Sequence, residues 1–291
     1  MKLFRIAREA VRGHHGYAGV QDILWGSAFK DGVATGHSAI RFNVSIKKAR
    51  SKLRSSDLIP RLIGGIKTDV TDFRFADQVR HELPYSLVRP LLGGVQVQLS
   101  ALRGPLQWGT MGCELVFNGV HYGICNEHVL NASQPDTVLQ PRRELFGEAI
   151  GRVSAIGDPR LDYRLVELME QADPLQSFNH LPGIADGYMM PSGMNVLRLI
   201  KTGAASGLTA GIYDGRSLLE PWRITIRAGK DIPLSSAGDS GSMWVADGTQ
   251  GGVFRMFALH TGGDEQGQMA MATLYASIHA SVQRQLSMGK R

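Results

Sequence analysis

Residues 234–245 read LSSAGDSGSMWV, a run of small and turn-forming residues that ends in an apolar Met-Trp-Val segment. Gly, Asp and Ser are frequent in tight turns, so one interpretation is a plain turn ahead of a buried strand. The other interpretation is a loop that presents Ser240 as a nucleophile, because Gly238 and Gly241 would let the backbone turn tightly around it. The amides of Gly238 and Ser240 could then converge on a developing oxyanion.

A serine hydroxyl is a weak nucleophile and needs a base within hydrogen-bond reach, which in turn needs an orienting carboxylate. His128 is the candidate base, because YGICNEHVLN (122–131) places it where an apolar strand enters a loop. Asp162, at the head of the strand LDYRLVEL (161–168), is the candidate carboxylate. Asp158 is the alternative, but Asp158-Pro159 is typical of a turn.

These residues follow one another in the order His128, Asp162, Ser240, which is the order of the chymotrypsin-type fold and not of subtilisin or the α/β-hydrolases. The first two lie 34 residues apart, and Ser240 follows 78 residues after Asp162. We therefore expect His128 and Asp162 in a first β unit, Ser240 in a second, and the site between the two.

From residue 95 onward, short β-rich runs follow one another with glycine-rich turns, as in VHYGICN (120–126), WRITIRA (222–228) and VFRMFALH (253–260). Such a pattern predicts β-sandwiches or β-barrels. Helical spacing returns only in residues 277–288. The predicted fold is therefore mainly β, with a first unit over 95–190, a second over 191–291 that ends in a helix, and a mixed N-terminal extension over 1–94.

The N-terminal extension opens with apolar residues at helical spacing between basic ones, which predicts a short basic amphipathic helix. Such a helix can dock on the protein's own body or lie on a membrane surface. The first hundred residues carry 16 Lys/Arg and 8 Asp/Glu, a net of +8, whereas the rest carry 16 and 18, a net of −2. This excess is either a solvated basic face or a surface for an acidic partner. No nucleic-acid-binding motif accompanies it.

The composition of the 291 residues, with 43% apolar and 20% charged side chains, is that of a globular protein. No window is apolar enough for a membrane span, and the charged first residues do not resemble a signal peptide, so we predict a cytoplasmic protein. Cys113 and Cys125 fit a reducing compartment. They flank Asn118-Gly119, a strong hairpin signal, and a two-residue loop would point their sulfurs to opposite faces, so we expect no disulfide.

From about Val95 to the end, the chain resembles a trypsin-like (chymotrypsin-fold) serine peptidase. The resemblance covers about two-thirds of the chain and rests on five segments in the same order: GTMGCELVFNGVHYGICNEHV, LDYRLVEL, KTGAASGLTAG, AGDSGSMWV and FALHTGG. The extension is similar, more weakly, to that of some bacterial trypsin-like proteins. The resemblance implies two six-stranded antiparallel β-barrels, hydrolysis of peptide bonds through an acyl-enzyme, and no cofactor.

The resemblance also assigns roles around the triad. Asp239, before the serine, would bury its carboxylate to hold the oxyanion loop. Leu234 would lie at the base of the primary pocket, where it offers no charge to a Lys or Arg side chain, and His260, Thr261 and Gly262 would line the pocket.

His260 has two interpretations: a pocket residue that favours Glu or Gln, or a histidine bonded within the barrel. The competing acids for a basic preference are Asp231 and Asp264. Where the secreted enzymes have two small residues before the histidine, this chain has Asn126 and Glu127, and Glu127 could simply face solvent.

Cys125 and His128 have the spacing of a metal pair, but the sequence suggests neither of the two further ligands that a zinc site needs, so no metal is predicted. The predicted function is a serine endopeptidase acting on a protein or peptide, with residues 1–94 restraining it, docking a regulatory partner or forming a homo-oligomer. The alternative is a non-catalytic binding or assembly protein on the same scaffold.

Overall fold

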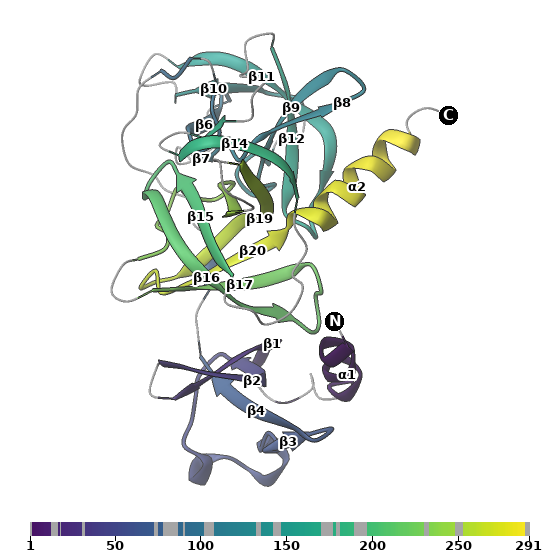
Figure 1. Cartoon of the computed structure of the whole chain (residues 1–291), viewed down its shortest axis with the longest axis vertical. Helices are drawn as coiled ribbons and strands as arrows, with labels where there is room; N and C mark the ends of the chain where they lie inside the picture. Colours follow the sequence, from purple (N-terminus) through teal and green to yellow (C-terminus); the bar gives the residue numbers. More distant parts are fainter. Residues whose placement is uncertain are drawn as a thin grey trace.

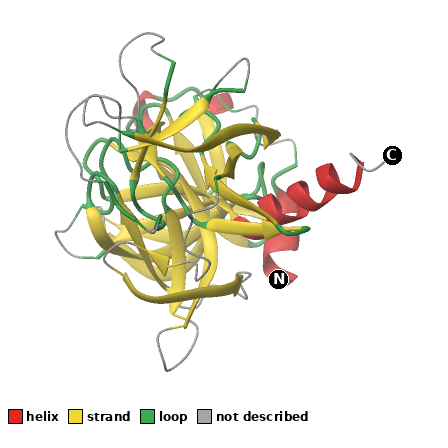
Figure 2. Ribbon diagram, turned by 90° about the horizontal axis from the view of Figure 1, so that it is seen from above, coloured by secondary structure: helices red, strands yellow, loops and turns green. Residues whose placement is uncertain are grey.

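The computed structural model of the protein describes all residues except 1, 13–16, 18, 31–32, 73–74, 78–86, 90, 102–107, 132–134, 142–146, 170–176, 179–180, 189–196, 230–232, 248–252 and 289–291. Three β-rich parts follow one another along the long axis of the molecule, with the N-terminal third at one end (Figure 1). Strands make up nearly all of the regular structure (Figure 2).

The N-terminal third contains α1 (Lys2–Ala10), β1 (Val20–Lys30), β2 (Val33–Val44), two short 3-10 turns (Arg50–Lys52 and Ser55–Asp57), β3 (Leu62–Ile63), β4 (Ile66–Thr71) and β5 (Phe75–Asp77). The first β unit contains β6 (Gln96–Leu99), β7 (Gly109–Thr110), β8 (Glu114–Phe117), β9 (Val120–Cys125), β10 (Thr137–Gln140), β11 (Glu148–Asp158) and β12 (Tyr163–Leu168). The remainder contains β13 (Ser177–Phe178), β14 (Leu181–Tyr188), β15 (Arg198–Gly203), β16 (Gly207–Ser217), β17 (Arg223–Ala228), β18 (Met243–Asp247), β19 (Val253–Asp264), β20 (Met269–Leu274) and α2 (Tyr275–Met288).

The second β unit is a closed six-stranded antiparallel barrel. Its strands pair in the cycle β15, β16, β17, β20, β19 and β18, and β18 pairs again with β15. The alternation of strand side chains explains its interior, since Ile224, Ile226 and Ala228 of β17 all face the core. The predicted second barrel is confirmed, and Ser240 lies in the loop that leads into β18.

The first β unit is a curled seven-stranded sheet in the order β7, β6, β10, β11, β12, β9, β8. Among the described residues its end strands do not pair with each other, so it is a half-barrel where a closed six-stranded barrel was expected. Residues 177–188 also differ from the predicted boundary, because β14 pairs in parallel with β19 and so extends the second sheet.

The β8–β9 hairpin follows the sequence closely. Asn118 and Gly119 have φ of 52° and 77°, the left-handed values that a two-residue hairpin loop requires. Phe117 faces Val120, as expected. Cys113 and Cys125 are both buried as free thiols.

Helix α2 packs where the two β units meet (Figure 1). Its buried residues Tyr275, Ile278 and Val282 share one core with residues of β9 and β12 on one side and of β18 and β19 on the other. The helix therefore packs against both β units where they meet. None of the helices in the described ranges is long and apolar enough to cross a bilayer.

The N-terminal third has its own core, in which Ala7 of α1 and Val11, directly after the helix, pack with Ile23 and Phe42. The predicted helix is therefore present and docks on the protein's own body. This third is not separate from the second barrel, however, because β1 pairs antiparallel with β16 and makes one continuous sheet with it. A buried ion pair, Arg41 to Asp214 at 2.6 Å, crosses this junction.

Candidate active site

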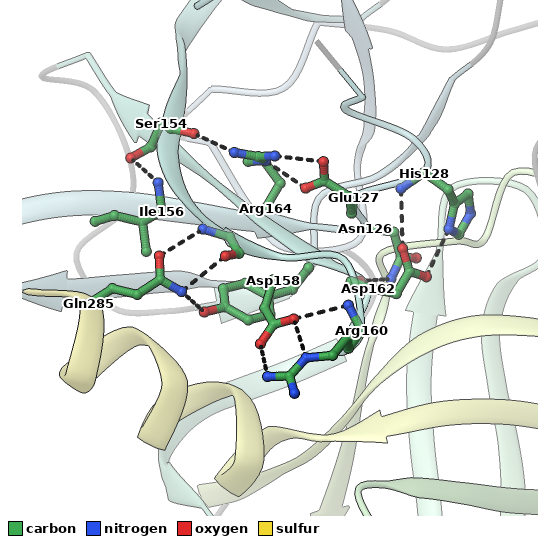
Figure 3. Close-up of polar contacts among 12 residues, drawn as sticks. Asn126, Glu127, His128, Ser154, Ile156, Asp158, Arg160, Asp162, Arg164 and Gln285 are labelled. Carbon is green, nitrogen blue, oxygen red and sulfur yellow. Dashed lines mark hydrogen bonds and ion pairs between the residues drawn. The ribbon is translucent and has the colours of Figure 1, made fainter. Parts of the chain in front are cut away.

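His128 and Asp162 are brought together by the pairing of β9 with β12. Arg164 lies opposite Cys125 in this antiparallel pair, so the residue before β12 meets the loop that follows β9. Asp162 Oδ2 lies 2.8 Å from His128 Nδ1, and Asp162 Oδ1 accepts a 3.1 Å bond from the His128 backbone N–H (Figure 3). An ionised carboxylate can only accept, so in a neutral imidazole paired with it Nδ1 carries the proton and Nε2 is the basic nitrogen.

The turn that presents Asp162 has an unusual backbone. Asp162 has a φ of 50°, a left-handed conformation that Asp adopts more readily than most residues. The buried Asn126 side chain donates a 2.7 Å hydrogen bond to the Asp162 carbonyl and fixes this turn from the histidine side. Asp158, the rival carboxylate, bonds instead to Arg160 on the same turn.

Glu127 does not simply face solvent, as the sequence allowed. It accepts two 2.6 Å hydrogen bonds from Nε and Nη2 of Arg164, two residues into β12 (Figure 3). Such a bidentate pair fixes orientation as well as distance. The chain therefore holds the histidine loop against the aspartate strand at two adjacent points, His128–Asp162 and Glu127–Arg164.

Helix α2 braces the same strand pair from outside. The Gln285 amide donates to the Gly157 carbonyl at 2.9 Å and to the Tyr163 hydroxyl at 3.1 Å (Figure 3). These bonds link the C-terminal helix to β11 and to the residue directly after Asp162.

The Ser240 loop lies against the first β unit. Thr110 of β7 donates its backbone N–H to the Ser240 carbonyl at 2.8 Å and its hydroxyl to the Gly238 carbonyl at 2.7 Å. Gly241 has a φ of 95°, and a Cβ there would overlap the Thr110 carbonyl and the Cys125 sulfur. Only glycine therefore allows this approach, which brings the serine loop beside Cys125, three residues before His128.

The Ser240 hydroxyl is buried, and its described hydrogen bond is a long one, 3.4 Å, to the Thr261 carbonyl. The backbone N–H groups of Gly238 and Ser240 donate to none of the residues that the structure describes. Buried N–H groups are seldom left unpaired in proteins. These are the two N–H groups that the sequence predicts to bind an oxyanion.

Asp239 anchors the loop from beneath, as the resemblance implies. Its buried carboxylate accepts the backbone N–H groups of Ala205, Ser206 and Ser236 and forms a 2.8 Å ion pair with the buried Lys201. Burial alone would raise the pKa of Asp239, but the Lys201 charge and the hydrogen bonds from the Lys201 and Ser206 side chains lower it to about 2. Asp239 is therefore ionised, and its role is to hold the loop.

Lys201 was missed from the sequence, although it lies in a segment that carries the resemblance. The signal that could have found it is its position. Of the two charged residues of β15, Arg198 is exposed and Lys201 lies among the buried Leu199, Thr202 and Gly203. A buried lysine needs a charged partner, and the aspartate beside the serine is one.

The predicted pocket residues lie in the second barrel. Leu234 is fully buried in its core, and the Thr261 hydroxyl bonds to the Met271 carbonyl. Asp264 accepts the Met269 N–H, and Asp231 lies outside the described residues. Gly262 continues β19 beside them.

His260 is also fully buried, and its Nδ1 accepts a 3.3 Å bond from the Trp244 indole N–H. Burial, followed by the Lys201 charge, lowers its pKa to about 3, so the ring is neutral. The indole can only donate, so the ring proton of His260 is on Nε2.

Within the described ranges, no group of three or more His, Cys, Asp or Glu side chains is placed to hold a metal ion. Cys125 donates to the Thr110 carbonyl, and burial raises the pKa of its thiol far above the ordinary range. The thiol that would partner His128 in a metal pair is thus a packed core residue.

Comparison with known proteins places these observations beside several proteases. The chain is similar to a serine protease described as specific for glutamic acid and as using a histidine triad in substrate binding, with 15% identity over 66% of this chain and 97% of that chain, and a TM-score of 0.47. It is also similar to protease A of Thermobifida fusca (16% identity, 65% and 94% covered, TM-score 0.44) and to a Cellulomonas bogoriensis chymotrypsin (16%, 65% and 94%, 0.43). No family model matches the chain, and no curated protein matches its sequence. With identities and TM-scores this low, the function has to be judged from the geometry of the site.

Proposed function

We propose that the chain is a serine endopeptidase in which Ser240 is the nucleophile, His128 the general base and Asp162 the residue that orients the base. The observation that carries this proposal is the two-point contact of Asp162 with the ring and backbone of His128, beside a serine loop held by Asp239. An imidazole fixed in this tautomer by a carboxylate is the arrangement that activates a serine hydroxyl.

The reaction follows from these roles. Ser240 Oγ attacks the carbonyl carbon of the substrate while His128 Nε2 takes the hydroxyl proton, and the amides of Gly238 and Ser240 stabilise the oxyanion. His128 then gives the proton to the leaving amine, which departs and leaves an ester on Ser240. A water molecule hydrolyses this ester by the same steps, so no cofactor is required.

For the substrate we propose a protein or peptide with a non-basic residue before the cleaved bond, Gln or Glu among the candidates. Leu234 offers no carboxylate to a Lys or Arg side chain, and a histidine on β19, His260, is a residue type that can donate to an amide or carboxylate oxygen. A site built to hydrogen-bond one side chain discriminates strongly against others. Since the ring is neutral, it would recognise Gln at least as well as Glu.

The N-terminal third is proposed to regulate this activity. Its loop over residues 45–56 is largely exposed and carries five basic residues, Lys47, Lys48, Arg50, Lys52 and Arg54. An acidic partner protein or a second copy of the chain could bind this surface. A cytoplasmic location stays a prediction that fits the two free buried thiols.

Profiling on a peptide library tests the proposal. The parent should cut peptide bonds, Ser240→Ala should lose activity on the order of a million-fold as in other triads, and Ser242→Ala, a buried serine in the same loop, should keep it. No cleavage by the parent would instead favour a non-catalytic binding protein, and equal cleavage by the parent and Ser240→Ala would refute Ser240 as the nucleophile. Cleavage after Arg or Lys that His260→Ala leaves unchanged would refute the proposed pocket.

A further inference from the structure

Strand β5, from the N-terminal third, pairs with β19 next to the candidate nucleophile. The pairing is antiparallel, with Asp77 opposite Gly262, Ala76 opposite Gly263 and Phe75 opposite Asp264. The other edge of β19 is taken by β20, which pairs with the same two glycines. Residues 75–77 therefore cover the second edge of β19 at this point.

This edge is open to an added strand because β18 stops short of it. The register of β18 with β19 ends at Met243 opposite Leu259, and the chain before Met243 is the Ser240 loop. The Gly241 N–H bonds to the His260 carbonyl, and the Ser240 hydroxyl bonds to the Thr261 carbonyl. The part of this edge that β18 leaves unpaired, Gly262–Asp264, thus begins directly after the residues that bond to the serine loop.

Such an edge binds extended peptides through main-chain hydrogen bonds, which demand no particular sequence. Two successive glycines in a strand often mark a place where another backbone approaches closely. Because β5 runs antiparallel to β19, its Asp77 end is the end nearer to Ser240.

We infer that residues 75–77 occupy the peptide-binding edge of the candidate protease as an intramolecular ligand, and that a substrate has to displace them. This inference rests on the proposed function. It names the regulating segment, the strand it covers and the class of competing ligand, an extended peptide backbone.

The sheet that precedes β5 in the chain is fixed to the second barrel by strand pairing. Only Asp72 and residues 73–74 separate β5 from β4, which ends at Thr71 paired with Asn43 of β2. The sheet that holds β2 is continuous with the second barrel through β1 and β16, and Arg41–Asp214 is buried across that junction. A short tether on a fixed scaffold gives a high effective concentration, so the inhibition is expected to be independent of protein concentration.

Two serine-directed probes separate edge occupancy from catalysis. One is a fluorophosphonate without a peptide; the other is a set of tetrapeptidyl phosphonates with Gln, Glu, Leu or Lys next to phosphorus, which need the β19 edge. The test variant is Ala76→Pro/Asp77→Pro. Bonded and non-bonded residues alternate in an antiparallel ladder, so two successive prolines remove one bonded amide whichever residue donates it. Ala76→Val keeps the amide, and Lys48→Pro places a proline in an exposed irregular segment of the same third.

The double-proline variant should react with the best peptidyl probe roughly tenfold faster than the parent, the factor expected when one or two backbone hydrogen bonds no longer compete. With the small probe, the double-proline variant should stay within about twofold of the parent. The two control variants should stay within the same limit with either probe, because a twofold change is smaller than the effect of losing one hydrogen bond. Equal peptidyl rates in the parent and the double-proline variant would overturn the inference while leaving the proposed function intact. Failure of the small probe to label Ser240 in any variant would instead overturn the proposed function.

A cross-linked variant covers the case in which the prolines unfold the chain. The Cα atoms of facing residues in an antiparallel pair lie about 4.5–5.5 Å apart, inside the range that a disulfide spans. Oxidised Ala76→Cys/Gly263→Cys should resist the peptidyl probe and regain its reaction on reduction, whereas the small probe should label both forms. Undiminished peptidyl labelling of the oxidised form would refute the inference.

Discussion

His128 is oriented from two sides, by the Asp162 carboxylate on its ring and by the Glu127–Arg164 pair one residue earlier. We expect Glu127→Ala to lower kcat by roughly ten- to a hundredfold with little change in KM, because a small displacement of a catalytic group is costly. Glu127→Gln, which keeps one acceptor, should lose less. The control is Arg160→Ala, which removes an exposed pair on the neighbouring turn. An unchanged kcat for Glu127→Ala would show that Asp162 alone orients the ring.

The burial of His260 predicts how the free energy of unfolding changes at acid pH. Its pKa in the folded protein is lowered to about 3, below the ordinary value of 6.5, so between these pH values the unfolded state binds more protons. The free energy of unfolding should therefore fall as pH drops from about 6.5 toward 3. Urea unfolding at pH 7, 5.5 and 4.5 should show a shallower decline for His260→Gln than for the parent or for His37→Gln, an exposed control. Parallel declines in all three would contradict the buried neutral ring.

For single residues, the sequence predicts the contacts that follow from the order of the residues along the chain and from their positions at strand ends. The placing of His128 beside Asp162 could be foreseen, since both stand at strand ends. The Arg164 contact of Glu127 and the Lys201 contact of Asp239 could not, because each pair joins strands that only the folded barrels bring together. The side chains alone did not reveal these partners.

The loop that carries Ser240 depends on β15 as much as on its own turn residues. Lys201 of β15 is buried and neutralises Asp239, so Lys201→Met should leave a buried carboxylate unpaired and cost about 3–5 kcal/mol in the free energy of unfolding. The double variant Lys201→Met/Asp239→Asn should recover much of this stability but not the activity, because the bonds to Ala205 and Ser206 weaken. A double variant no more stable than the single one would show that the pair is not coupled.

β1 is among the elements that the sequence did not reveal. Gly26 interrupts its strand pattern, yet the structure needs glycine there, since a Cβ would lie 2.9 Å from the Asp214 carbonyl oxygen. Gly215, its partner on β16, faces the Trp25 carbonyl in the same way. A residue that weakens strand propensity thus permits the close sheet pairing that joins the N-terminal third to the barrel.

For the whole molecule, we expect the Arg41–Asp214 pair to couple the stability of the N-terminal third to that of the second barrel. Arg41→Met should cost about 3–5 kcal/mol in the free energy of unfolding, since Asp214 stays buried without its 2.6 Å partner. Hydrogen exchange should then rise in both β1 and β16, because one ladder joins them. Lys48→Met, at an exposed site, is the control. Faster exchange confined to residues 20–44 would show that the second barrel does not depend on the extension.

The measurement that tests the central claim most directly is labelling with a fluorophosphonate, followed by mass spectrometry of the modified peptide. The account predicts one phosphonylated residue, Ser240, in the parent, strongly reduced labelling in His128→Ala, and none in Ser240→Ala, while Ser242→Ala is labelled like the parent. Labelling that persists in Ser240→Ala, or a folded parent that never reacts, would contradict the proposal that this site is a catalytic triad.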